Sequence, residues 1–151
     1  MNDHNKYMKI ALQLAQPAMD KGDEPFGAIL VKDGQVVAKS ENSIVSLSDP
    51  TKHAELKIIS DYTQLTKQVD LSDYTMYTSC EPCFMCSGAT VWANLGTLVY
   101  SAGSRDLNEM INENLFDSSD IVYEYSHHKP IVIKNVLHDE GVEILRSYFT
   151  E

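Results

Sequence analysis

All three cysteines of the chain lie within seven residues, at Cys80, Cys83 and Cys86. No pair of them can join distant segments through a disulfide, as the cysteines of small secreted domains do. A hydrophobic core must therefore hold the fold together, and the chain, with 151 residues of which 43% are apolar, is large enough to build one. We expect a single domain over residues 1–151, in which the cysteines serve as ligands and not as cross-links.

The sequence contains no signal for export or membrane insertion. No run approaches the roughly 18 apolar residues of a membrane span, and the first twenty residues lack the basic start and apolar run of a signal peptide. We therefore expect a cytoplasmic protein with no membrane partner.

The net negative charge of the chain argues against a nucleic acid as its partner. It has 22 acidic and 12 basic side chains, which give a formal net charge of −10. Proteins that bind nucleic acids gain much of their affinity from Lys and Arg that neutralise phosphates, and no basic run occurs here. We expect a small-molecule substrate and not a nucleic acid, although a small basic patch is compatible with an acidic average.

Apolar periodicity predicts an alternation of helices and strands. Steps of three and four indicate amphipathic helices, and short apolar runs indicate strands. The expected helices cover residues 5–18, 53–62, 83–94 and 139–149, and the expected strands cover residues 26–32, 35–40, 74–78, 97–101 and 131–133. Pro17 should bend the first helix or lie near its end, and Asp33-Gly34 favours a tight hairpin turn. Residues 103–129 are polar and predict a loop with one helix near 108–115. This alternation points to a three-layer α/β domain.

Two motifs carry the chemistry, and each opens a predicted helix: His53-Ala54-Glu55 and Pro82-Cys83-Phe84-Met85-Cys86. The free N–H groups and the dipole at a helix start favour the ionised thiols that a metal requires. His53, Cys83 and Cys86 give three ligands, whereas a structural zinc site normally has four protein ligands. Three ligands predict a catalytic zinc site with one open position.

Glu55 is the candidate acid and base beside this site. It lies two positions from His53, so it does not share the same face of the helix and is badly placed as a fourth ligand. Zinc can lower the pKa of a bound water from about 15.7 to about 7, and Glu55 would move its proton. Taken alone, Pro-Cys-x-x-Cys also fits a redox pair or half of a zinc knuckle. Cys80 forms a second Cys-x-x-Cys with Cys83, and we interpret it as a buried apolar residue.

The combined motif, His-x-Glu followed by Pro-Cys-x-x-Cys, resembles the cytidine deaminase-like superfamily, whose Glu lies outside the metal coordination shell. Residues 25–34, 49–55 and 77–86 are similar to the short bacterial guanine deaminases, and the resemblance spans about residues 5 to 100. It implies zinc-dependent hydrolysis of an exocyclic amino group. It also implies a three-layer α/β/α fold, a mixed sheet of about five strands with helices on both faces, and a homodimer.

The resemblance further implies substrate contacts. Asn42 would hydrogen-bond the base, Phe26 and Trp92 would line the pocket around the purine ring, and Ala54 would lie beside the substrate. The guanine-type family generally carries Phe followed by two acids late in the chain, and Phe116-Asp117-Ser118 keeps one of them, Asp117. Other interpretations stay open, since Phe26 and Trp92 could fill the core and Asn42 could satisfy a loop backbone.

Three functions follow from this reading. The first is deamination of guanine, or of a close purine analogue, to the oxo base and ammonia. The second is deamination of adenosine in tRNA, since tRNA adenosine deaminases share Glu-Pro-Cys-x-Met-Cys; the charge and the lack of a basic C-terminal helix count against it. The third is a non-catalytic zinc-binding interaction module, which has no chemical need for Glu55. The family tends to close its site with an aromatic tail from a partner subunit, and this chain ends near the aromatic pair Tyr148-Phe149.

Overall fold

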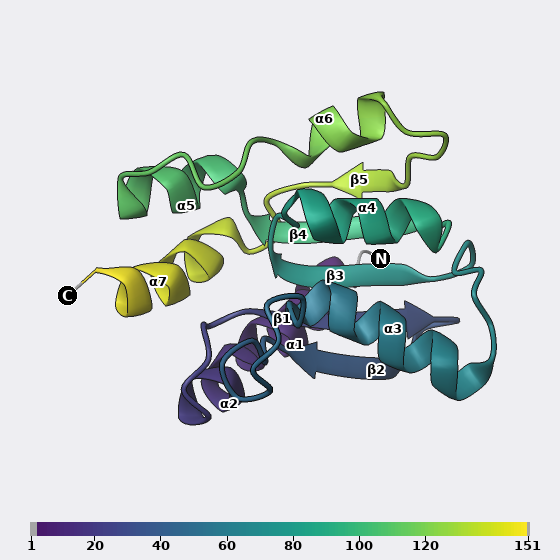
Figure 1. Cartoon of the computed structure of the whole chain (residues 1–151), viewed down its shortest axis with the longest axis horizontal. Helices are drawn as coiled ribbons and strands as arrows, with labels where there is room; N and C mark the ends of the chain where they lie inside the picture. Colours follow the sequence, from purple (N-terminus) through teal and green to yellow (C-terminus); the bar gives the residue numbers. More distant parts are fainter. Residues whose placement is uncertain (1–2, 151) are drawn as a thin grey trace.

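A computed structural model describes residues 3–150; Met1, Asn2 and Glu151, which complete the predicted domain range, lie outside the described residues. Five strands form one sheet in the order β2-β1-β3-β4-β5 (Figure 1). They are β1 (Gly27–Lys32), β2 (Gln35–Glu41), β3 (Thr75–Cys80), β4 (Thr97–Ala102) and β5 (Ile131–Ile133). β1 pairs antiparallel with β2 and β3, whereas β3, β4 and β5 run parallel. The predicted mixed sheet is confirmed.

Helices cover both faces of this sheet. Figure 1 shows α3 (Ala54–Thr66) and α4 (Phe84–Trp92) in front of it, while α1 (His4–Gln13) lies behind it and α7 (His138–Phe149) packs against α1 and β4. The side chains of β1 alternate accordingly: Ala28 and Leu30 join a core cluster with α3 and α4, and Ile29 and Val31 join one with α1. Burial on both faces explains why this strand is apolar from Gly27 to Val31. The predicted three-layer α/β/α fold is confirmed.

The turn between the first two strands has the predicted form. Asp33 and Gly34 both adopt left-handed backbone angles, with φ of 52° and 73°. Two successive residues with positive φ give the turn whose twist matches that of the flanking strands. The hairpin is therefore specified locally by this dipeptide.

The first predicted helix is wrong as a single element. In the structure α1 ends at Gln13, and a separate helix, α2, covers Ala15–Asp20. Pro17 lies in the first turn of α2, where a residue without a backbone N–H leaves no helical hydrogen bond unmade. Pro17 therefore marks the start of a second helix and not the bend of one long helix.

The polar segment 103–129 holds two helices and not one. The predicted helix near 108–115 is displaced, because α5 covers Ser104–Ile111 and ends at Asn112, whose φ is 56°. The second helix, α6 (Ser119–Glu124), was not expected. Side-chain capping stabilises both starts: Asp106 Oδ2 accepts the N–H of Gly103 at 2.8 Å, and Ser118 Oγ accepts the N–H of Asp120 at 3.2 Å. No helix within residues 3–150 is long and apolar enough to cross a bilayer.

A buried carboxylate holds the loop between β2 and α3. Asp23 is fully buried, and its side chain accepts hydrogen bonds from the N–H of Val45 at 2.8 Å, the N–H of Ser46 at 3.0 Å and the Ser46 hydroxyl at 2.6 Å. Burial raises the pKa of Asp23, but these hydrogen bonds outweigh burial, so the pKa lies below its usual value of 3.8. The ionised carboxylate thus fixes a loop that also carries Asn42.

We predict that Asp23→Asn lowers the free energy of unfolding at pH 7 by about 1–3 kcal/mol, because the charged acceptor of these hydrogen bonds is lost. A folded-state pKa below the unfolded one gives stability that is present above the unfolded pKa and is lost as the pH falls. The difference in the free energy of unfolding between wild type and Asp23→Asn, measured by urea titration, should therefore shrink below about pH 4. The exposed Asp20→Asn serves as the control, and a difference that persists at low pH would contradict this account.

Candidate active site

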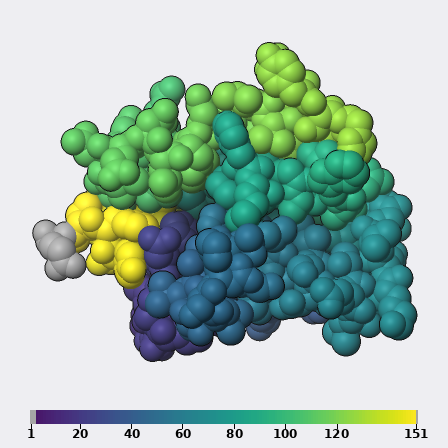
Figure 2. All heavy atoms as spheres, in the orientation of Figure 1, coloured from purple at the N-terminus to yellow at the C-terminus, as the bar shows by residue number. Residues whose placement is uncertain are grey.

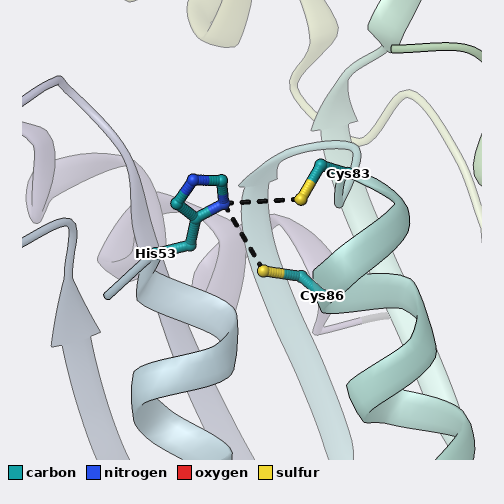
Figure 3. A group of neighbouring side chains, drawn as sticks. All are labelled: His53, Cys83 and Cys86. Atoms are coloured by element: carbon teal, nitrogen blue, oxygen red, sulfur yellow. Dashed lines mark hydrogen bonds between the residues drawn. The ribbon is translucent and has the colours of Figure 1, made fainter. Parts of the chain in front are cut away.

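The two sequence motifs meet because each opens a helix beside the same strand end. His53 is the N-cap of α3 and Cys83 is the N-cap of α4, both in extended backbone conformation, and Cys86 lies in the first turn of α4. Figure 3 shows the side chains of His53, Cys83 and Cys86 pointing toward one another from these two helices. The structure therefore brings the three predicted ligands together.

The spacing of these side chains fits zinc. Nδ1 of His53 lies 3.4 Å from Sγ of Cys83 and 3.6 Å from Sγ of Cys86, and the three ligand atoms lie within 4.8 Å of one another. Tetrahedral zinc with Zn–N of about 2.0 Å and Zn–S of about 2.3 Å places its nitrogen and sulfur ligands about 3.5 Å apart. Within residues 3–150 no other group of three His, Cys, Asp or Glu side chains meets this spacing. Cys80 is buried and outside the group.

The surroundings of Cys83 favour its ionised form. A hydrogen bond with the Cys86 thiol lowers the pKa of Cys83; burial opposes this effect, and contact with His53 adds to it. The net result is a pKa well below the usual range of a thiol. A thiolate is the form that binds a metal. The pKa of Cys86 is raised instead, by its hydrogen bond with Cys83 and by burial, so Cys83 is the thiol of the pair that the protein alone favours in the ionised form.

Glu55 is the one acidic side chain in the first turn of α3, and it is buried. Burial raises its pKa to about 7, with the nearby His53 acting in the opposite direction. A carboxyl group with a pKa near neutrality can both accept and return a proton under physiological conditions.

A cavity of about 530 Å³ contains these residues, a size typical of small-molecule sites. His53, Glu55 and Cys83 line it, together with two of the predicted substrate contacts, Phe26 and Asn42. The opposite wall comes from α5, the segment that follows it and the end of α7. Figure 2 shows α5 (green) beside the end of α7 (yellow) at one end of the molecule.

Asn42 and Phe26 line the cavity and also make local structural contacts. Asn42 is buried, its Oδ1 accepts the N–H of Ile44 at 3.1 Å, and it also faces the cavity. The ring of Phe26 packs against that of Phe149, with centroids 6.2 Å apart, and both rings line the cavity. The aromatic end of this chain therefore reaches its own cavity, whereas the family resemblance implied a tail from a partner.

Three of the predicted substrate contacts do not reach the cavity of this chain. Ala54 is buried in the core behind the site. Trp92 ends α4 with 83% of its surface exposed, and its ring lies 5.5 Å from that of His127. Asp117 is exposed and its Oδ1 accepts the N–H of Ser118, so it turns back on its own backbone. The direction of each side chain, which the sequence does not give, decides these outcomes.

Glu81 is a site residue that the sequence reasoning missed. Its buried carboxylate accepts the N–H of Ser104 at 2.9 Å, the N–H of Ser119 at 2.8 Å and the Ser119 hydroxyl at 2.6 Å. It thereby ties the starts of α5 and α6 to the segment that leads into Cys83. The signal available in the sequence was an acidic residue directly before Pro82, shortly after the end of a predicted strand and within the shared Glu-Pro-Cys-x-Met-Cys motif.

Comparison with known proteins agrees with this geometry. The pattern of the family described as the cytidine and deoxycytidylate deaminase zinc-binding region matches residues 1–102. The chain belongs to this family. Its members are zinc-dependent hydrolytic deaminases, so the zinc and the reaction class predicted from the motifs are confirmed.

Individual relatives of this deaminase differ in substrate. Guanine deaminase of Bacillus subtilis (strain 168) is 39% identical over 108 residues, which are 71% of this chain and 69% of that protein. A tRNA-specific adenosine deaminase of Agrobacterium fabrum is 33% identical over 151 residues, which are 100% of this chain and 97% of that protein. A solved structure from a study of tRNA:A34 deaminases superposes with a TM-score of 0.80 at 30% identity, covering 92% of this chain and 98% of the other.

We predict that Cys83→Ser abolishes retention of zinc through dialysis, because the hydroxyl that replaces the thiolate is a far weaker ligand. The wild-type chain should retain about one zinc ion, measured by inductively coupled plasma mass spectrometry. Cys80→Ala is the matched control and should retain zinc as the wild type does. Loss of zinc from the Cys80 variant, with retention by the Cys83 variant, would show that the ligand set is a different one.

Proposed function

We propose that the chain deaminates a small aminated purine, with guanine as its substrate, and that Asn42 and Phe26 contact the base. The observation that carries the proposal is a cavity of small-molecule size that is lined by His53, Cys83 and the buried Glu55, with Cys86 grouped behind the first two. The similarity to a guanine deaminase supports guanine in particular.

We propose that His53, Cys83 and Cys86 hold the zinc ion. When bound there, zinc would supply a hydroxide nucleophile at neutral pH by lowering the pKa of water. Glu55 would take the proton that water gives up and return it to the departing amino nitrogen. The ring carbon gains an oxygen, the bond from this carbon to the amino nitrogen breaks, and ammonia leaves. The pKa of about 7 suits Glu55 to both proton transfers.

We predict that Glu55→Gln keeps zinc and loses turnover by about a hundredfold to ten-thousandfold, since the amide cannot exchange the proton. The measurement is ammonia release from guanine together with the zinc content of the same preparation. Full activity in the variant would contradict the proton-transfer role.

The substrate is tested with a panel of guanine, guanosine, adenine, adenosine, cytosine and cytidine. Release of ammonia from guanine in preference to the others supports the proposal. Release of ammonia from another base, with none from guanine, would leave the proposed mechanism standing and show that guanine is not the substrate.

A second candidate function is deamination of adenosine in tRNA. The observation that favours it is the similarity to a tRNA-specific adenosine deaminase along the whole chain. The formal charge of −10 opposes it, because binding of RNA depends strongly on neutralisation of phosphates. An anticodon stem-loop that binds with a steep salt dependence and releases ammonia would establish this function in place of the first.

We also propose a homodimer in which α4 contributes to the interface. Phe84, Met85 and Trp92 expose 43%, 38% and 83% of their surfaces on this helix. Large apolar side chains that gather on one exposed surface are typical of protein interfaces. Light scattering should give the mass of two chains, and Trp92→Glu should shift the protein toward one chain; an unchanged mass in the variant would exclude Trp92 from the interface.

A further inference from the structure

The charged groups around the cavity are all of one sign apart from His53. Four glutamates line it, and none of its 14 lining residues is Lys or Arg. Two of the four already have roles: Glu55 lies beside the metal ligands, and Glu81 accepts hydrogen bonds from Ser104 and Ser119. Glu24 and Glu113 remain, and neither has a role in the mechanism.

Glu24 is the more enclosed of these two side chains. It lies in the segment between α2 and β1, directly before Pro25, and is half-buried, whereas Glu113 is exposed. Its carboxylate makes no hydrogen bond or ion pair with any residue within 3–150, and its electrostatic influence reaches His53. Burial raises the pKa of Glu24, and His53 opposes this. A half-buried carboxylate with no donor from the protein is free to accept hydrogen bonds from water or from a bound ligand.

The position of Glu24 relates it to the substrate. Two residues on is Phe26, whose backbone N–H donates to the Glu24 carbonyl at 2.9 Å and whose own carbonyl accepts the N–H of Asn42 at 2.9 Å. The three residues thus belong to one hydrogen-bonded corner of the cavity. Asp117, the acid that the family resemblance implied as a substrate contact, is not among the residues that line the cavity.

We propose that the Glu24 carboxylate accepts hydrogen bonds from N–H groups of the substrate, and that this cavity, whose lining holds four Glu and no Lys or Arg, selects uncharged aminated bases over phosphorylated nucleotides. The proposal rests on the proposed function. A carboxylate only accepts hydrogen bonds, so it matches the ring and amino N–H groups of a base such as guanine. Away from the metal group, a phosphate would face the carboxylates of Glu24 and Glu113 with no Lys or Arg in the lining to neutralise it, and like charges discriminate against such a ligand.

The test compares zinc-loaded full-length wild type with Glu24→Gln, using guanine and guanosine monophosphate as substrates. We expect Glu24→Gln to raise KM for guanine about tenfold to a hundredfold, the effect of losing a hydrogen bond to a charged group, with a much smaller change in kcat. The ratio of kcat/KM for guanine to kcat/KM for guanosine monophosphate should fall by a similar factor. Glu109→Gln, an exposed change on α5, is the matched control and should leave both constants unchanged. Thermal midpoints and zinc content identify a variant that fails to fold.

The outcomes separate this proposal from the proposed function. An unchanged KM and an unchanged preference in Glu24→Gln, or the same rise in KM from Asp117→Asn alone, would overturn the role of Glu24. If the wild type deaminates a different base, the comparison uses that base, and only the assignment of guanine fails. If the wild type binds guanine in calorimetry without turning it over, the proposed function fails. The ratio of the dissociation constants of wild type and Glu24→Gln for guanine still tests the role of Glu24. Failure to bind any base overturns both.

Discussion

Two helix starts that face each other are the constraint on which the rest of the site depends. The first residues of α3 and α4 leave backbone N–H groups unpaired and present the positive ends of two helix dipoles, which favour thiolates. His53 and Cys83 are the caps of these helices, and Cys86 follows one turn later, so Nδ1 of His53 lies within 3.6 Å of both sulfur atoms. A shift of either helix by one residue would rotate its ligand away from the others.

Two parts of the chain build the cavity. Residues 1–102, which match the deaminase family, contain the three candidate ligands and Glu55. Much of the opposite wall of the cavity follows residue 102, from α5, the segment after it and Phe149. Glu81 joins the two parts, because its carboxylate lies beside the metal-binding turn and accepts hydrogen bonds from the starts of α5 and α6.

The sequence predicted those elements whose cause is local. The hairpin at Asp33-Gly34 follows from the tolerance of these residues for positive φ, and the starts of α3 and α4 were expected within one residue of their places. Apolar periodicity did not reveal the division of the first helix at Leu14, which precedes Pro17 in the first turn of α2, or the existence of α6, which starts at a Ser118 cap. At the site, the His53, Cys83 and Cys86 group was predicted from residue types, spacing and helix starts together with the family resemblance, because Pro-Cys-x-x-Cys taken alone also fits other sites. The positions of Trp92, Asp117 and Glu24 depend on side-chain directions and on distant segments, so only the structure places them.

X-ray absorption spectroscopy at the zinc edge of the purified protein tests the central claim most directly, because it counts the protein ligands of the metal. A catalytic site requires three protein ligands, whereas a structural site has four. The account predicts one imidazole nitrogen and two sulfur ligands per zinc ion, with the remaining position not filled by a protein side chain. Three sulfur ligands, which would bring Cys80 into the site, or a closed set of four protein ligands would contradict it.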